Sequence, residues 1–189
     1  MHPLTPSQTV GPFFHVAVPV RGRARLVTDA TPGPRIVVHG SVCDGAGDPV
    51  PDALIEIWQG NAAGCCSHPE DPRCAGPDRA FDGFGRVGTD AGGRFVIETI
   101  KPGSVPGPDE QPQAPHLVVG LFARGLLTRL VTRIYFEDEP ANAQDAILAS
   151  VPADRRSTLV AQRSPGNPDG RYDFAIVLQG PGETVFFDV

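Results

Sequence analysis

The run from Pro115 to Glu139 contains the residues whose spacing comes nearest to a metal site. Its apolar pattern predicts strands, and on a strand residues two positions apart point to the same face. A His-x-His pair would therefore set two imidazoles side by side, ready to share a metal ion. In this chain His116 is followed two places later by Val118, whose hydrocarbon side chain cannot coordinate a metal. The run thus offers one ligand where two would be needed.

A second group of metal-ligand types lies at Cys65, Cys66, His68 and Cys74. The two-residue gap that separates a usual pair of zinc thiolates is missing, so a zinc site is not favoured. Adjacent cysteines do not readily pair with each other, and the set lacks the spacing of a secreted disulfide framework. We expect reduced thiols, as in a cytoplasmic protein.

Residues 83–88 read Gly-Phe-Gly-Arg-Val-Gly, which matches the glycine pattern of dinucleotide sites. That pattern binds a pyrophosphate only where a strand precedes it and a helix begins after it. Here an Asp-Ala-Gly-Gly turn and an apolar strand follow. We therefore interpret the segment as part of a β-hairpin.

Short apolar runs separated by glycine- and proline-rich turns predict the elements that position these residues. Residues 1–34 are proline-rich and weakly periodic, which favours an extended N-terminal arm. One or two short helices are expected over 140–149 and near 152–156, because Pro140 fits a first helical position. Strands are expected over residues 35–43, 53–59, 85–89, 94–100, 116–123, 127–136, 171–179 and 184–188. We predict an all-β protein, a single domain over 1–189 whose core, 35–189, is a two-sheet β-sandwich.

Length and charge limit the classes of function. A chain of 189 residues suits one domain with a substantial core. Its net charge of -6 argues against nucleic acid as a partner, since phosphate binding needs clustered lysine and arginine. No apolar stretch is long enough to span a membrane, and no secretory signal is evident. We expect a soluble, cytoplasmic protein with neither a nucleic-acid nor a membrane partner.

The segment from Val38 to Cys66 resembles the signature of the intradiol ring-cleavage dioxygenases. The matching parts read Val-His-Gly-Ser-Val from residue 38, Gly-Asp-Pro-Val from residue 47 and Ile-Glu-Ile-Trp-Gln from residue 55. Further matches, such as Lys-Pro-Gly from residue 101, extend the resemblance over essentially the whole chain. The opening Thr-Pro-Ser-Gln-Thr and the closing Gly-Glu-Thr-Val-Phe-Phe-Asp are more similar to one branch, the α subunits of α/β hetero-oligomeric members.

The resemblance implies four iron-ligand positions, two tyrosines and two histidines in the active members. The tyrosine positions fall on Cys66 and Val105, and the histidine positions fall on His116 and Val118. The position of the family's catalytic arginine falls on Gln113. Ferric iron favours anionic oxygen ligands with imidazole completing the shell, which one imidazole and one thiol cannot provide. We expect no metal in this chain, and we interpret His116 as a hydrogen-bonded histidine near the surface of the sandwich.

The resemblance further implies a role beside a partner's iron. A β subunit would hold Fe(III), and the complex would open 3,4-dihydroxybenzoate between its hydroxyl groups with O2, giving 3-carboxy-cis,cis-muconate. Arg124 would anchor the substrate carboxylate, for which a guanidinium is suited through charge-assisted hydrogen bonds. Thr9, Gly11 and Pro12 of the arm would line the pocket at the subunit interface.

Other interpretations stay open at this level. Without the resemblance, Arg124 is a solvated turn arginine and the arm simply packs on its own domain. The segment from Arg35 to Gln59 also resembles transthyretin-like sandwiches, which would make the chain a non-enzymatic binding or interaction module. A divergent intradiol enzyme active as a homo-oligomer is disfavoured by the emptied ligand positions.

Overall fold

Strands dominate the structure, a computed structural model that describes residues 6–11, 13–14, 23–71, 73, 81–107, 111–164 and 170–188. The helical elements bounded within these ranges are the 3-10 helices η2 (Pro140–Gln144) and η3 (Arg156–Leu159) and the α-helix α2 (Ala146–Ser150). None of the helices in these ranges has the length and apolar content needed to cross a bilayer. The strands are β1 (Arg23–Arg25), β2 (Arg35–Cys43), β3 (Leu54–Trp58), β4 (Phe84–Gly88), β5 (Arg94–Ile100), β6 (Val105–Pro106), β7 (Pro112–Gln113), β8 (His116–Phe122), β9 (Leu130–Phe136), β10 (Val160–Arg163) and β11 (Arg171–Val177). The expectation of a mostly β protein with few helices is confirmed.

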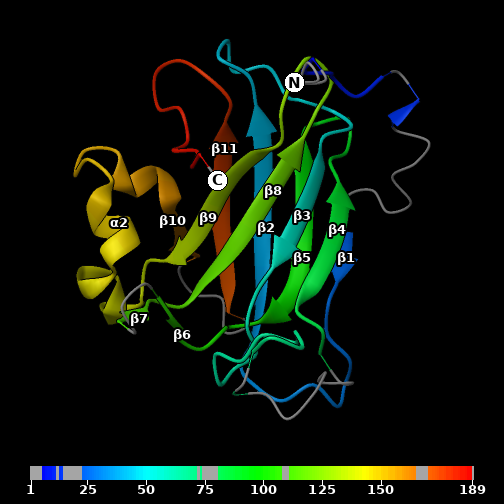
Figure 1. Cartoon of the computed structure of the whole chain (residues 1–189). Coiled ribbons are helices and arrows are strands. Elements are labelled where there is room, and N and C mark those ends of the chain that lie inside the picture. The colour runs from blue at the N-terminus through cyan, green and yellow to red at the C-terminus, as the bar shows by residue number, and fades with distance from the viewer. Residues whose placement is uncertain are drawn as a thin grey trace, which may run out of the picture.

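Nine of these strands form one continuous sheet in the order β1-β5-β2-β11-β10-β9-β8-β3-β4. Strand β10 joins its two halves, because it pairs antiparallel with β11 and parallel with β9. The sheet curves until β4 and β1, its two edge strands, lie side by side (Figure 1). Two sheets packed as a sandwich were expected. Instead, β10, a strand that was not predicted, bonds to both halves and makes them one continuous sheet.

A core of aliphatic and aromatic side chains fills the space between the two halves of the sheet. Strand β2 alternates buried and half-buried residues, as a strand with one inward face must. Gly40 of β2 lets the core close, since a Cβ there would lie 2.0 Å from the ring of Phe95. The fully buried core includes Val38, Ile55, Ile97, Leu117, Val119, Leu121 and Ile134.

Several boundaries differ from the expected ones. Strand β9 begins at Leu130 instead of 127, and residues 127–129 belong to the loop after β8. Residues 184–188 form only an isolated bridge between Phe187 and Val131. The proline-rich segment contributes β1, which pairs in parallel with β5. Three residues are too few to show a strand period, so only tertiary pairing reveals β1.

Asp145 divides the expected helix over 140–149 into η2 and α2. Its backbone is extended, and its carboxylate caps α2 by accepting a hydrogen bond from the Leu148 amide at 2.7 Å. The same carboxylate accepts the Tyr135 hydroxyl at 3.1 Å and the Ala114 amide at 2.7 Å. The helical segment is thereby fastened to the beginning of β8 and the end of β9.

Candidate functional site

Strand β8 separates the candidate residues into two groups. His116 and Val118 lie at its beginning, and Val105 and Gln113 lie on the short neighbouring strands β6 and β7. Arg124 lies beyond its other end. A strand advances about 3.3 Å per residue, so the two ends of β8 lie about 20 Å apart. The two groups therefore belong to different sites.

The first group, called here the ligand-position cluster, consists of Cys66, Val105, Gln113, His116 and Val118. Val105 pairs with Gln113 across β6 and β7. His116 and Val118 share one face of β8, and Val118 lies opposite Trp58 of β3. Cys66, the fifth position, lies beside the Trp58 side chain. The fold thus gathers residues that are up to 52 positions apart in the chain (66 to 118) at one end of β8.

His116 is hydrogen-bonded, as expected, through Nδ1 to the carbonyl oxygen of Ala114 at 2.7 Å. It is buried and not near the surface, with 8% of its area exposed and its ring 5.5 Å from the ring of Tyr135. Burial, and then the positive charge of Arg133, lower the pKa of His116 to about 4. The imidazole is therefore neutral at physiological pH.

Arg133 of β9 brings a positive charge to the ligand-position cluster. It is the direct cross-strand partner of Val118, so both side chains lie on the same face of the sheet. Its Nη1 donates to Oε1 of Gln113 at 2.6 Å and to the hydroxyl of Tyr135 at 3.2 Å. The Phe187 ring lies 5.9 Å from its guanidinium carbon. Sequence reasoning missed Arg133, because only the register of β8 against β9 places it opposite Val118.

Gly64 closes the loop that carries Cys66. Its φ of +76° lies in the left-handed region, and a Cβ there would lie 1.8 Å from the carbonyl oxygen of Ser104. Burial, and then the negative charge of Asp71, raise the pKa of the Cys66 thiol. In the absence of a metal the thiol therefore stays protonated at neutral pH.

The second group lies where the loop after β8 meets the N-terminal arm. The Arg124 guanidinium pairs with Asp52, with Nη2 3.0 Å from Oδ2 and Nε 3.4 Å from Oδ1. The next residue, Gly125, donates its backbone N–H to Oγ1 of Thr9 at 2.8 Å. The structure therefore joins Thr9 and the Arg124 turn, which the sequence singled out separately. About half of the Arg124 side chain (54%) remains exposed.

Asp52 is a residue of this group that sequence reasoning missed. Its φ is 60°, in the left-handed region that residues other than glycine seldom adopt. Its side chain is only 16% exposed in the ion pair. Nothing in the sequence around Asp52 points to its partner, because Arg124 lies 72 residues further along the chain.

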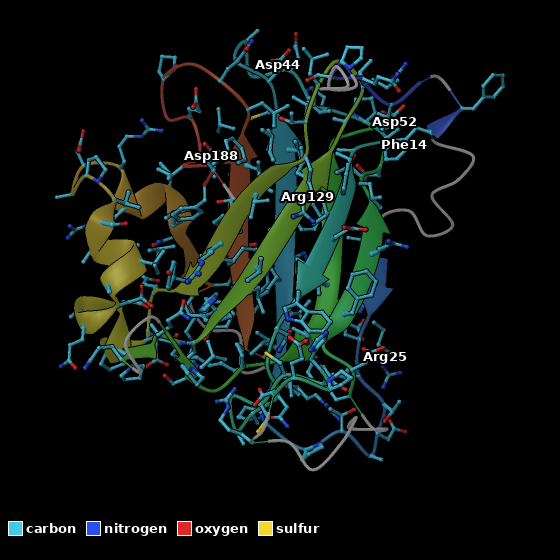
Figure 2. The ribbon with its side chains drawn as sticks, viewed as in Figure 1. Phe14, Arg25, Asp44, Asp52, Arg129 and Asp188 are labelled. Carbon is cyan, nitrogen blue, oxygen red and sulfur yellow. The ribbon has the colours of Figure 1, made fainter. Side chains whose placement is uncertain are left out.

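Gly11, two residues after Thr9, makes a local contact within the arm. Gly11 accepts a hydrogen bond from the Phe14 amide at 3.0 Å, and a Cβ on Gly11 would meet no atom of the described residues within 4 Å. Pro12 lies outside the described residues. A cavity of about 240 Å³ lies between residues 8–10 of the arm and the loop that contains Arg129. Figure 2 shows Asp52, Phe14 and Arg129 toward the same end of the molecule.

Comparison with known proteins assigns the chain to a family. The family model described as Dioxygenase matches residues 9–180. The protocatechuate 3,4-dioxygenase alpha chain of Burkholderia cepacia is 44% identical over 199 residues, which cover 98% of this chain and 97% of that protein. The chain belongs to the intradiol dioxygenase family.

Other members of the intradiol family show the same relationship at greater distance. The protocatechuate 3,4-dioxygenase beta chain of Burkholderia cepacia is 42% identical over 159 residues, covering 80% of this chain and 67% of that one. The structure of catechol 1,2-dioxygenase from Acinetobacter sp. ADP1 superposes with a TM-score of 0.67 at 23% identity, covering 88% of this chain and 63% of that one. The curved, nearly closed sheet is therefore the intradiol fold.

The non-haem Fe(III) typical of the intradiol family does not fit the residues present in this chain. The side chains of Val105 and Val118 have no donor atoms, and Cys66 offers a sulfur donor in place of a phenolate oxygen. Ferric iron favours anionic oxygen ligands, which the ligand-position cluster lacks. In the described ranges no three His, Cys, Asp or Glu residues lie close enough together to hold a metal ion. Cys74 of the alternative zinc group lies outside those ranges.

Proposed function

We propose that this chain is the iron-free α subunit of a protocatechuate 3,4-dioxygenase whose β subunit holds Fe(III). The observation that carries the proposal is the likeness to the Burkholderia cepacia alpha chain along 97% of its length. The α/β complex opens protocatechuate (3,4-dihydroxybenzoate) between its two hydroxyl groups with O2, and the product is 3-carboxy-cis,cis-muconate. Oxidation belongs to the partner subunit, and this chain contributes pocket wall and substrate anchoring in the cytoplasm.

The position of Arg124 supports this division of roles. Its loop lies about 20 Å along β8 from the ligand-position cluster of the same chain, so it is too distant to serve a site there. It is exposed at a surface that a neighbouring subunit can reach. We assign to Arg124 the carboxylate of a substrate bound in the partner.

The ion pair with Asp52 leaves Arg124 able to hold that carboxylate. Asp52 engages Nε and Nη2 of the guanidinium, and Nη1 keeps two N–H donors. A carboxylate accepts charge-assisted hydrogen bonds from such an edge, and the planar group sets its orientation. Asp52 thus holds the guanidinium without blocking it.

The arm and its surroundings suit a subunit interface. Thr9 fixes the loop through Gly125, and Gly11 offers backbone to a ligand or a partner, since no side-chain atom of the part of the chain described by the structure lies within 4 Å of its missing Cβ. We assign Pro12 to the same wall. Among the described residues, Phe13 and Leu127 are large apolar side chains with 80% and 60% exposure near this end. Apolar residues at such positions are typical of the contact between subunits.

Expression with and without a partner tests the division of roles. The chain alone should give a colourless protein without iron, and co-expression with the β subunit should give a coloured, iron-containing and active complex. A stoichiometric iron content with a tyrosinate charge-transfer band in the chain alone would contradict the assignment. A stable lone domain that never associates with a β subunit would contradict it as well.

Replacing Arg124 tests the carboxylate assignment. In the complex, Arg124→Ala should raise the KM for protocatechuate about 10- to 100-fold, the usual effect of losing a hydrogen bond to a charged group. The KM for catechol, which has no carboxylate, should change less than about twofold by the same argument. Arg129→Ala is the matched control, because it removes a cation from the same loop. Equal effects on the two substrates would show that Arg124 does not touch the carboxylate.

A further inference from the structure

We propose that Arg133 is the resident cation of the ligand-position cluster and that its guanidinium excludes metal ions from this chain. Arg133 would disfavour iron in this chain whichever substrate or partner the complex uses. The iron of the intradiol family does not fit the residues present here. Because donor atoms are missing, iron would gain little binding free energy at the cluster. The guanidinium of Arg133 takes the place of the metal ion.

The ligand-position cluster keeps the hydrogen bond that would orient His116 as a metal ligand. The hydrogen bond from His116 Nδ1 to the Ala114 carbonyl, at 2.7 Å, is the kind that orients a metal-binding histidine through its second nitrogen. Burial and the contact with the Tyr135 ring keep the imidazole in place. The scaffold of the cluster is therefore built, and loss of local structure is not what excludes a metal.

Arg133 is held among the former ligand positions from several sides. It lies across from Val118, and its Nη1 reaches Gln113 at 2.6 Å. Gln113 in turn donates through Nε2 to the carbonyl oxygen of Pro106 at 2.8 Å, next to Val105. The Phe187 ring adds a cation–π contact at 5.9 Å. The guanidinium is thus fixed by groups that flank three of the cluster positions.

The charge of Arg133 is already balanced within the chain. Its second hydrogen bond goes to the hydroxyl of Tyr135 at 3.2 Å, and that hydroxyl donates to the buried carboxylate of Asp145. One positive and one negative charge are therefore linked through a shared hydroxyl. Across the described residues, the only buried side-chain polar atom without a hydrogen-bond partner is Oδ1 of Asn142, which is not in the cluster. Asp71, which accepts a hydrogen bond from the Cys66 amide, is likewise paired with Arg73. A metal ion would add positive charge beside a guanidinium, and these two carboxylates of the described residues already have partners.

Restoring ligands separates the effect of the cation from the effect of the missing donors. The triple variant Cys66→Tyr, Val105→Tyr and Val118→His recreates two tyrosines and two histidines together with His116. This variant is compared with versions that also carry Arg133→Met or Arg133→Lys. All full-length proteins are loaded with Fe(III) citrate and desalted, and iron per chain and the tyrosinate charge-transfer band are measured.

With Arg133 retained, the triple variant should bind little iron, and adding Arg133→Met should increase iron per chain at least about tenfold, because the like charge is gone. Arg133→Lys keeps the charge and should leave iron binding low. The natural chain with Arg133→Met alone should stay iron-free, since its donors are still missing. Stoichiometric iron in the triple variant with Arg133 retained would overturn the proposal. Equally low iron in all versions that are folded by circular dichroism would overturn it too.

A smaller change keeps the test decisive if the triple variant does not fold. Val118→His alone creates a two-imidazole pair with His116, and its affinity for Zn(II) is measured by competition with a chelating dye. Adding Arg133→Met should tighten Zn(II) binding at least about tenfold, and Arg133→Lys should not. Arg129→Met on the same background controls for a general change in net charge. Equal Zn(II) affinities with and without Arg133 would reject its role as the excluding cation.

Discussion

Two single residues, Arg124 and Asp52, determine how a ligand can be held at the end of β8 that precedes the Arg124 loop, called here the arginine end. Arg124 is exposed enough to reach a ligand, yet Asp52 pairs with one edge of its guanidinium and limits its conformations. Asp52 adopts a φ of 60°, which is unfavourable for a residue with a Cβ, so its position is determined by the surrounding turn. The pair therefore positions a cation instead of neutralising it.

Asp52→Asn tests this positioning role. In the α/β complex it should raise the KM for protocatechuate about two- to fivefold, because exposed ion pairs contribute about 0–1 kcal/mol. The KM for catechol should not change, and steady-state kinetics with both substrates measure the difference. A lower KM for protocatechuate would instead mean that Asp52 competes with the substrate for Arg124.

His116 predicts a pH dependence of stability at the other end of β8. Its pKa is lowered to about 4 in the folded chain, so the unfolded chain binds more protons between about pH 4 and 6.5. The contribution of His116 to the free energy of unfolding is therefore present above pH 6.5 and is lost as pH falls toward 4, by about 3 kcal/mol in all.

His116→Asn should remove this part of the pH dependence. Asparagine can still donate a hydrogen bond to the Ala114 carbonyl but does not titrate. Urea unfolding at a series of pH values should give a flatter profile from pH 6.5 to 4 than the unsubstituted chain gives. An unchanged profile would show that His116 is not the group that titrates there.

At the scale of elements, the loop between β3 and β4 depends on Gly64 to dock against the segment before β6. The Ser104 carbonyl occupies the place where a Cβ would stand, at 1.8 Å. Backbone conformation and close approach both require glycine there. The loop thereby brings Cys66 to Trp58 and completes the ligand-position cluster.

Gly64→Ala should lower the free energy of unfolding by about 2 kcal/mol or more, because it combines backbone strain with a backbone clash. Gly47→Ala is the matched control, since Gly47 also has a positive φ (86°) but no atom within 4 Å of its missing Cβ. The control should lose only about 1 kcal/mol, the cost of left-handed backbone alone. Urea denaturation of both variants measures the difference, and equal losses would exclude a role for the Ser104 contact.

At the scale of the whole molecule, the arginine end and the ligand-position cluster are two separate sites. The nearly closed sheet holds them at opposite ends of β8, so no motion of one side chain could bring them together. The arginine end combines a cation, an arm and exposed apolar side chains. This combination suits association with a second subunit, in agreement with the proposed α/β complex.

Leu127→Glu tests the contact surface. An exposed leucine contributes little to the stability of the chain itself, so its thermal unfolding should shift by no more than a few degrees. Affinity for the β subunit should fall at least about tenfold, because a charge would be buried without a partner at the interface. Sedimentation of mixed subunits measures the affinity. Unchanged assembly would place the interface elsewhere.

Local pattern predicted the longer strands well. β2 and β5 have the expected bounds, because alternation over seven or more residues is clear and Gly-rich turns border them. β1, β6, β7 and β10 were not predicted, because strands of two to four residues show too little periodicity. β10 matters most among them, since the connection between the two halves of the sheet depends on it.

The sequence by itself determined which donors this chain lacks. A valine side chain cannot bind a metal in any fold, so Val105 and Val118 already showed in the sequence that two ligand side chains are absent. Only the tertiary structure decided what fills the ligand-position cluster and what holds Arg124. Arg133 and Asp52 act on partners that lie 20 and 72 residues away, at Gln113 and Arg124. Side-chain chemistry is a local property of the sequence, whereas a partner is set by strand register and sheet closure, which pair distant segments through space.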